Sequence, residues 1–278
     1  KGANAAVLER VRVAFVADSA AAEQAIKDAS VDVVWRSLDP AGLDRITAEI
    51  RQSPNKETAA GFRAAELPDT RVRRLIWNPA SPSWGNAAQR QAVARALQAD
   101  RTLASIVPSI AAGGMNTFPV GGRPSAAPAT GQRPRLTLSW WSRDSGQGDA
   151  ARLVRDRIED AGISVQLVPD RLEADLFLSD RTAWVNTAFG WLQPYLDHPL
   201  PGSATKLADL EQRARSTADL ATRQVLLNEI QQQAAVDLTV LPVSQGPDSL
   251  LLLRGVRFPD DDSGFGPGYQ LGLWGFGK

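Results

Sequence analysis

Few residues of this sequence have the types and spacing that phosphate binding or catalysis requires. A Ser-Gly-Gln-Gly turn at residues 145–148 lies between a predicted strand and a predicted helix, where a nucleotide-binding loop would lie. It contains Gly146 and Gly148 but lacks the third glycine of a dinucleotide fingerprint and the Gly-Lys-Ser/Thr ending of a phosphate loop. We therefore interpret the turn as a chain reversal into a helix.

The sequence also offers little for a hydrolase, a metal site or a cofactor. His198 is the only histidine, and its proline-flanked segment without a serine elbow favours a solvated loop residue over a catalytic triad. The absence of cysteine excludes disulfides, zinc–thiolate sites and cysteine nucleophiles. Asp260, Asp261 and Asp262 resemble a calcium loop but lack the alternating ligands of an EF-hand, so we predict a solvated acidic turn. No carboxylate pair stands out for glycosidase chemistry, and we predict neither catalysis nor a cofactor.

Tryptophan is the more informative residue type. Six of the eight tryptophans lie at predicted strand ends and in loops, away from the middle of apolar runs: Trp77, Trp84, Trp140, Trp141, Trp184 and Trp191. Two interpretations stay open for these side chains. They fill the core, or they line a ligand cleft through stacking and apolar contact.

Composition limits the class of protein. With 278 residues and 43% hydrophobic content, the chain can bury the core of one large domain or two modest ones. Its 31 basic and 31 acidic residues balance, so we expect no nucleic-acid partner and no electrostatic attraction to a membrane. The chain has no membrane-spanning apolar run and no visible signal peptide, so an export signal or anchor is expected upstream. Arginine outnumbers lysine 26 to 5, which suggests a GC-rich genome.

Apolar periodicity predicts an α/β chain built from βαβ units. The predicted strands span residues 11–16, 31–35, 71–77, 174–178, 237–243, 250–253 and 269–274. The predicted helices span residues 20–29, 41–51 and 87–99, with two more within 207–235. A complete strand–helix–strand unit is predicted at 136–169, with Gly162 ending its helix. Residues 184–196 fit either a helix or a loop, and the Gly/Pro-rich stretch 109–134 indicates a binding loop, a tether or disorder.

The order of these segments resembles the later part of a bacterial extracellular solute-binding protein of family 5, the oligopeptide- and dipeptide-binding group of ABC importers. The segments that carry the resemblance run through nearly the whole chain. They are residues 11–34, 74–84 (RLIWNPASPSW), 89–101 (QRQAVARALQADR), 136–169 and 207–243, the last with its ATR and VLPV motifs. The composition and the pattern are also similar to those of an actinobacterium-like, GC-rich source.

The resemblance implies a fold in which two lobes close on a ligand like a clamshell. We therefore expect an α/β, periplasmic-binding-protein-like chain of the type II clamshell kind, with βαβ units and a mixed sheet, that comprises one lobe and part of the other. Residues 1–40 would end the first lobe and residues 41–250 would form the second, including the loop at 109–134. Residues 251–278 would return to the first lobe.

The resemblance further implies solute binding without catalysis. The expected role is the extracellular solute-binding component of an ABC importer, which binds a peptide or another small solute and contacts the importer's permease. The protein would work at the cell envelope, lipid-anchored to the outer face of the cytoplasmic membrane through an upstream anchor. The predicted ligand contacts are strand-end or loop residues: Trp140, Trp141, Arg143, Asp180, Arg181, Thr182 and Trp184. The tryptophans would cover apolar parts of the ligand, and Arg143 or Arg181 would meet a carboxylate.

One departure from the family pattern bears on the ligand. On the simplest alignment, Trp184 replaces the Asp that pairs with a peptide's amino terminus, unless Asp180 takes that place by a shift in register. Without a carboxylate partner a cleft discriminates a peptide amine poorly. An alternative hypothesis is therefore an envelope lipoprotein of the same fold, similar to actinobacterial ones, that regulates cell-wall lipid or glycolipid assembly through protein contacts. It predicts an exposed apolar patch instead of a polar cleft.

Overall fold

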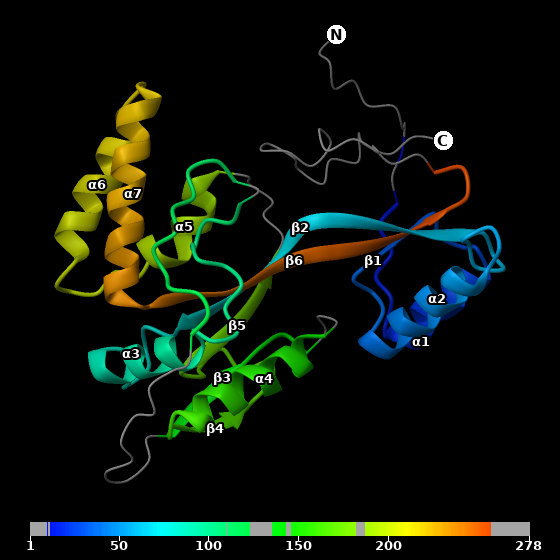
Figure 1. Ribbon diagram of the computed structural model, residues 1–278, viewed down its shortest axis with the longest axis horizontal. Helices are drawn as coiled ribbons and strands as arrows, with labels where there is room; N and C mark the ends of the chain where they lie inside the picture. Colours follow the sequence, from blue (N-terminus) through cyan, green and yellow to red (C-terminus); the bar gives the residue numbers. More distant parts are fainter. Residues whose placement is uncertain are drawn as a thin grey trace. The chain divides into compact units, whose positions relative to one another are not determined.

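The computed structural model describes residues 10, 12–109, 111–122, 135–142, 146–181 and 187–256, apart from the side chains of 67–70 and 181. These residues form a mixed six-stranded sheet in the order β1-β6-β2-β5-β3-β4, together with helices (Figure 1). The chain divides into two compact units, and the long strands β2 (Phe62–Trp77) and β6 (Val240–Leu253) contribute residues to both.

Unit 1 comprises residues 1–70, 143–146 and 247–278. Its described elements besides parts of β2 and β6 are α1 (Ser19–Lys27), β1 (Val33–Trp35) and α2 (Pro40–Gln52). Each helix begins at an aspartate whose carboxylate accepts a backbone N–H of the first turn, Asp18 in α1 and Asp39 in α2. The apolar stripes of the helices are buried in one cluster with side chains from both long strands: Ile26, Ile46, Ile50, Phe62 and Leu251.

Unit 2 comprises residues 71–142 and 147–246 and contains the predicted strand–helix–strand unit. Strand β3 (Arg135–Ser139) leads through helix α4 (Gln147–Asp160) to β4 (Ser164–Leu167), which pairs parallel to β3. Strand β5 (Leu176–Arg181) pairs parallel to β3 on its other side and antiparallel to β2. Gly162, the second residue after α4, has a φ of +84°, a conformation that glycine adopts without steric cost.

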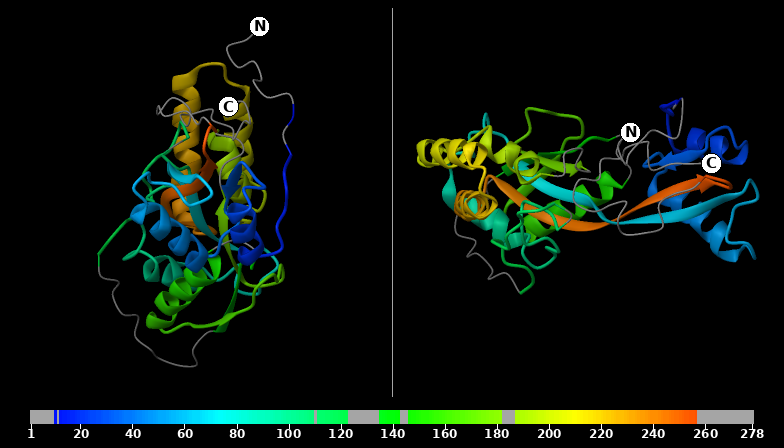
Figure 2. Two further views of the ribbon diagram at one scale, coloured as in Figure 1. Left: turned by 90° about the vertical axis from the view of Figure 1, so that its right-hand side faces the viewer. Right: turned by 90° about the horizontal axis from the view of Figure 1, so that it is seen from above.

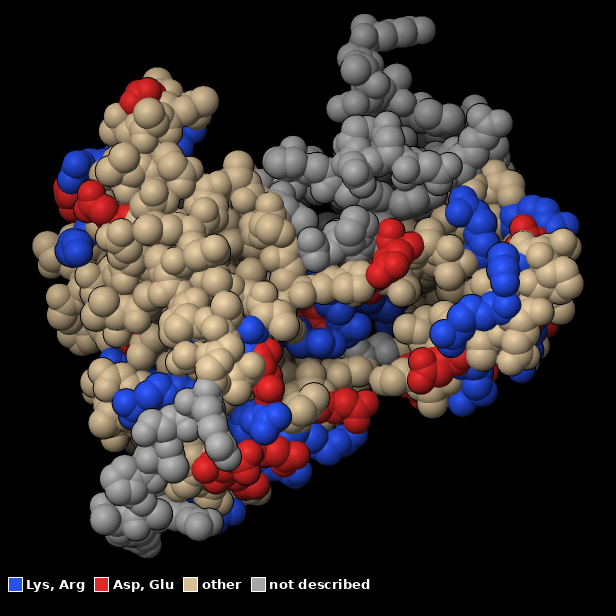
Figure 3. Space-filling view, in the orientation of Figure 1, with Lys and Arg blue, Asp and Glu red and all other residues tan. Residues whose placement is uncertain are grey.

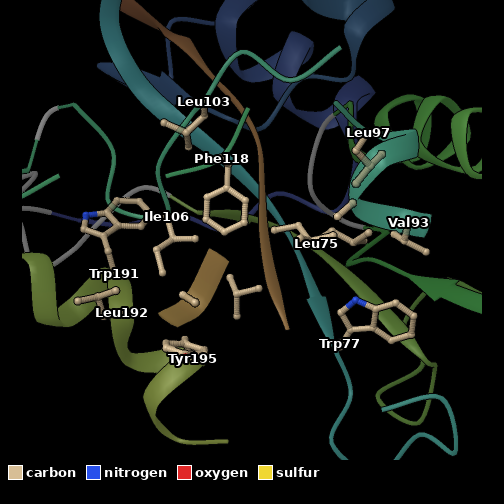
Figure 4. Packing of buried hydrophobic residues seen from close by; sticks show 14 of the residues in the cluster. Leu75, Trp77, Val93, Leu97, Leu103, Ile106, Phe118, Trp191, Leu192 and Tyr195 are labelled. Atoms are coloured by element: carbon tan, nitrogen blue, oxygen red, sulfur yellow. The ribbon is translucent and has the colours of Figure 1, made fainter. Parts of the chain in front are cut away.

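Four further helices complete the described part of unit 2: α3 (Ala87–Ala96), α5 (Ala188–Leu196), α6 (Ala204–Ser216) and α7 (Leu220–Asp237). Helices α6 and α7 form a hairpin and lie side by side in all views (Figure 2). Figure 4 shows the core of this unit in two groups. Leu75, Trp77, Val93 and Leu97 gather around β2 and α3, whereas Ile106, Phe118, Trp191, Leu192 and Tyr195 gather beside α5.

Most of the predicted helices are confirmed, including the helix start at Asn86, whose side chain caps α3. The predicted strand at 11–16 is wrong for the residues described. Residues 12–16 belong to no strand, and Val13 and Phe15 are 67% and 96% exposed. Alternating apolar residues make a strand only when a neighbouring chain supplies hydrogen-bond partners, and no described segment pairs with this one.

Three other boundaries differ from the predicted ones. The strand expected at 71–77 begins at Phe62, and the strands expected at 237–243 and 250–253 are one strand, β6. The segment 184–196 is helical from Ala188 onward. The described part of the Gly/Pro-rich stretch, residues 109 and 111–122, has no helix or strand but buries Ala111 and Phe118. The predicted strand at 269–274 and the acidic turn at 260–262 lie outside the described residues.

The two units have boundaries near residues 70 and 246, whereas the predicted lobes have boundaries at 40 and 250. Helix α2 accordingly lies in unit 1 together with α1. The assignment of the units to the two lobes of a binding protein stays a prediction. Within the described part of the chain, no helix is both long enough and apolar enough to span a bilayer.

Candidate ligand-binding site

Three of the predicted site residues lie at the carboxyl ends of β3 and β5 in unit 2. These strands are parallel neighbours, with Ser139 paired to Phe177. Trp140 and Trp141 follow β3 directly, and Asp180 lies at the end of β5. In open α/β sheets, ligands bind beyond the carboxyl ends of the parallel strands. This end of the sheet is therefore the candidate site.

Asp180 is held by two arginines of the neighbouring strand. The register of β2 and β5 places Arg73 opposite Asp180. Strand alternation places Arg71 on the same face of β2 as Arg73. Arg71 Nε and Nη2 each lie 2.7 Å from Asp180 Oδ2, and Arg73 Nε lies 3.2 Å from the same oxygen. Charge-assisted hydrogen bonds of this kind offset the loss of hydration that a buried carboxylate suffers.

Exposure within this ion cluster is unequal. The Asp180 side chain is 0% exposed, whereas the Arg71 and Arg73 side chains are 20% and 24% exposed. A ligand that reached the cluster would therefore meet guanidinium groups before it met the carboxylate. This arrangement differs from an acidic anchor for a peptide amine, the role in which Asp180 was considered above.

The two tryptophans after β3 have different environments. Trp140 is buried at 8% exposure, and Trp141 is 38% exposed with its ring 5.3 Å from that of Phe177 in an edge-to-face arrangement. The backbone of this segment is fixed by Asp170. The Asp170 N–H donates to Trp140 O at 2.9 Å, and the carboxylate of Asp170 accepts hydrogen bonds from the backbone N–H and the hydroxyl of Ser142 at 2.9 and 2.5 Å.

Gln147, the first residue of α4, is a buried polar residue at this end of unit 2. Its side chain is completely buried, and neither its amide nitrogen nor its amide oxygen has a hydrogen-bond partner. A buried amide without a partner is rare in folded proteins because its lost hydration is not replaced. Helix α4 packs on β3 and β5, so its first turn lies near the carboxyl ends of these strands.

Four other predicted site residues lie wholly or in part outside the described residues. Arg143, Thr182 and Trp184 lie outside the described residues, as does the side chain of Arg181, whose backbone ends β5. Sequence reasoning missed Arg71, Arg73 and Gln147. The Arg-Val-Arg order of residues 71–73 in a predicted strand was a usable signal, because it places two guanidinium groups on one face.

The remaining tryptophans favour the core interpretation where they are described. Trp77 and Trp191 are 1% and 3% exposed and belong to the main core of unit 2. Arg74 lies on the opposite face of β2 from Arg73. It donates to the Trp191 carbonyl at 2.6 Å, with its guanidinium carbon 4.9 Å from the centre of the Trp191 ring. Trp84 is partly buried against the same core.

A separate cavity of about 190 Å³ lies beside α3 in unit 2. It is lined in part by Arg101, a buried cation whose three nitrogens donate to the carbonyl oxygens of Pro242, Pro119 and Ala94. Burial lowers the pKa of Arg101 to about 10. Because its hydrogen bonds connect three separate segments, we interpret Arg101 as a residue that stabilises the structure of unit 2.

The site offers binding groups and no catalytic constellation among the residues described. His198 is exposed in its loop, as predicted. The described residues contain no group of three or more His, Cys, Asp or Glu side chains suited to a metal ion. Around α4 the surface carries acidic and basic side chains in alternation (Figure 3), including the pairs Arg152–Asp149 and Arg155–Asp156.

The fold is similar to that of solved substrate-binding proteins of ABC transporters. CtaP, an ABC transporter substrate-binding protein from Listeria monocytogenes, matches with a TM-score of 0.69 at 16% identity, over 94% of this chain and 59% of its own. AgaA from A. tumefaciens R10, solved with agropinic acid, matches with a TM-score of 0.69 at 16% identity, over 95% and 59%. DppA from Helicobacter pylori, solved with the peptide STSA, matches with a TM-score of 0.67 at 11% identity, over 94% and 55%.

These similarities define the fold class, an α/β binding-protein fold with a mixed sheet, as the sequence predicted. The chain spans somewhat more than half the length of each of these proteins. No protein-family model and no curated protein sequence matches it.

Proposed function

We propose that this chain is part of the solute-binding component of an ABC importer and binds a peptide or another small solute without catalysis. The observation that carries the proposal is the fold, which the chain shares along 94–95% of its length with substrate-binding proteins. The candidate site supports it, because polar and aromatic side chains gather at the carboxyl ends of β3 and β5, where such sheets bind ligands.

The proposal includes the partners and the place of work. A permease would receive the solute, and the protein would act outside the cytoplasmic membrane, held there by an upstream lipid anchor. The solutes bound by the similar structures range from the peptide STSA to agropinic acid. The fold alone therefore leaves the chemistry of the solute open.

Native mass spectrometry of the whole protein, gently purified from its own cells, tests the proposal. We expect a discrete added mass that is lost on activation and that fragments as a small molecule. A protein that stays bare, and that binds nothing from peptide and small-solute libraries, would count against solute binding.

A pair of variants tests the location of the site. Trp141→Ala removes the half-exposed ring beside Phe177, and we expect it to weaken binding of the recovered solute about tenfold through lost stacking. Val236→Ala is the matched control, because Val236 is a 71% exposed apolar residue on α7. Equal affinities for the two variants would remove Trp141 from the site.

A further inference from the structure

We infer that the cavity beside α3 is a second binding site of unit 2, which takes a small carboxylic acid with an apolar body. This site is distinct from the candidate ligand-binding site, because the residues that line the cavity include none of those at the carboxyl ends of β3 and β5. The inference therefore goes beyond the proposed function and does not depend on it.

The cavity lies toward the opposite end of β5 from the candidate ligand-binding site. Trp77 pairs with Leu176, the first residue of β5, and its N–H donates to the carbonyl oxygen of Thr239 at 2.9 Å. Leu238, which precedes Thr239, lines the cavity together with residues of α3 and α7. We therefore expect the two sites to bind their ligands separately.

The first observation is a buried positive charge without an opposite charge. Arg101 is 4% exposed and lines the cavity, and its guanidinium group donates to three backbone carbonyl oxygens. Carbonyl groups supply partial charges but no net negative charge. Among the described residues no carboxylate pairs with Arg101, and the neighbouring Asp100 pairs with Arg157 instead. A carboxylate that entered the cavity would supply the missing negative charge.

The second observation is that the cavity wall offers further groups that bind anions. The Thr117 hydroxyl oxygen is buried and has no hydrogen-bond partner within the described part of the chain, and a hydroxyl is able to donate to a carboxylate. Arg95 of α3 lines the cavity as a second cation, and its side chain forms no ion pair with a described residue. No described aspartate or glutamate lines the cavity. Charge and hydrogen bonding therefore both favour an anion.

The third observation is the apolar remainder of the cavity wall. The centre of the Phe118 ring lies 5.6 Å from the guanidinium carbon of Arg101, and Ala235 and Leu238 add apolar groups from the end of α7. The cavity volume of about 190 Å³ exceeds the roughly 150 Å³ that accommodates a benzene ring. An aromatic carboxylic acid of the size of benzoate therefore fits both the volume and the charge of the cavity.

Three probes of similar shape and different charge test the inference: benzoate, neutral benzamide and cationic benzylamine. Binding to the whole protein, freed of carried-over solute, is followed by NMR of alanine and leucine methyl groups, since Ala94, Ala235 and Leu238 line the cavity. We expect benzoate to shift these signals and to bind at least about tenfold more tightly than benzamide, because only benzoate gains a charge-assisted hydrogen bond. Benzylamine should leave the signals unchanged.

A variant that fills the cavity tests the location of binding. We expect Ala235→Leu to weaken benzoate at least about tenfold, because the larger side chain occupies the volume that the ligand needs. Leucine is a good helix former, so α7 should persist. Ala221→Leu is the matched control, because Ala221 is exposed near the start of the same helix. Equal affinities for the two variants would place the binding elsewhere and overturn the inference.

Thr117→Val separates a ligand contact from a structural role. The hydroxyl has no hydrogen-bond partner, so its replacement by a methyl group should leave the melting temperature of the ligand-free protein level or raise it. The affinity for benzoate should fall about tenfold through the loss of one hydrogen bond to a charged group. A lower melting temperature with unchanged affinity would overturn the assignment of Thr117 to the site.

The remaining outcomes decide the class of ligand. Equal binding of benzoate and benzamide would overturn the choice of an anion. If none of the three probes shifts the methyl signals of the cavity, the cavity holds water only and the inference fails. Neither result bears on the proposed function, which is tested by the solute that the protein carries and by the Trp141→Ala variant.

Discussion

Asp180 shows how a single buried charge shapes the candidate site. Its carboxylate lies on the same face of β5 as Leu176 and Leu178, both 0% exposed, and thus borders the core of unit 2. Two guanidinium groups of β2 compensate it. Removing one charge from such a cluster lowers the free energy of unfolding far more than an exposed ion pair raises it. The remaining charges stay shielded from water but lose a partner of opposite sign.

We expect Asp180→Asn to lower the free energy of unfolding of unit 2 by about 3 kcal/mol, because two partly buried guanidinium groups lose the negative charge that Asp180 supplies. Urea unfolding followed by tryptophan fluorescence measures this change. Asp209→Asn is the control, since its pair with Arg213 is about 60% exposed on both sides and should contribute less than about 1 kcal/mol. If both variants lost a similar amount of unfolding free energy, the Asp180 ion cluster would contribute no more to stability than an exposed ion pair.

At the scale of elements, helix starts in this protein depend on short polar side chains. Asp219 begins α7, where its carboxylate accepts hydrogen bonds from the backbone N–H and the hydroxyl of Thr222 at 2.8 and 2.5 Å. The hydrogen bonds from Thr222 lower the pKa of Asp219 below its ordinary value of 3.8. The ionised carboxylate is therefore the form that stabilises the helix start.

We expect Asp219→Ala to speed hydrogen exchange in the first turn of α7 at neutral pH, since an orphan backbone N–H loses its acceptor. The contribution of the carboxylate is fully present above pH 3.8, the unfolded-state pKa, and is lost as the pH falls through the lower folded-state value. The variant and the parent should thus converge in thermal stability in acid. Glu229→Ala is the control, because Glu229 is exposed in the middle of α7, and it should leave the first turn protected from hydrogen exchange. Equally fast exchange of the first turn in both variants would refute the capping role of Asp219.

At the scale of the whole molecule, each of the two units has hydrophobic clusters of its own. Ile26, Ile46 and Phe62 belong to a cluster of unit 1, and Leu136, Leu138 and Ile158 belong to the main cluster of unit 2. Strands β2 and β6 contribute residues to both units. Because each unit has its own hydrophobic core, we expect each unit to unfold locally with its own free energy.

We expect Leu138→Ala to destabilise unit 2 by about 2–5 kcal/mol, because it opens a cavity at a residue of 0% exposure. Hydrogen exchange measured segment by segment should accelerate in β3, β4 and α4 and stay unchanged in α1 and α2. Ile26→Ala, at a residue of 1% exposure in α1, should give the reverse pattern. Equal acceleration throughout the chain in both variants would show one cooperative unit instead of two.

The sequence by itself determined the features that depend on neighbouring residues. Asn86 as a helix cap, Gly162 as a left-handed helix end and Ile26 as an inward residue were all predicted and are confirmed. Each follows from hydrogen bonding, backbone sterics or periodicity within one or two turns of chain. The class of fold followed from the order of such elements.

Only the tertiary structure decided which distant residues meet. The sequence does not indicate that β2 starts at Phe62, because the first part of the strand is polar and contains Pro68. This part forms a strand through pairing with β6 and not through local apolar alternation. Nothing local distinguishes Trp77, which is buried in the core, from the half-exposed Trp141. Arg71 and Asp180 are 109 residues apart in sequence and meet only through the register of β2 and β5. That register is set by the burial of a whole sheet face, which no short stretch of sequence contains.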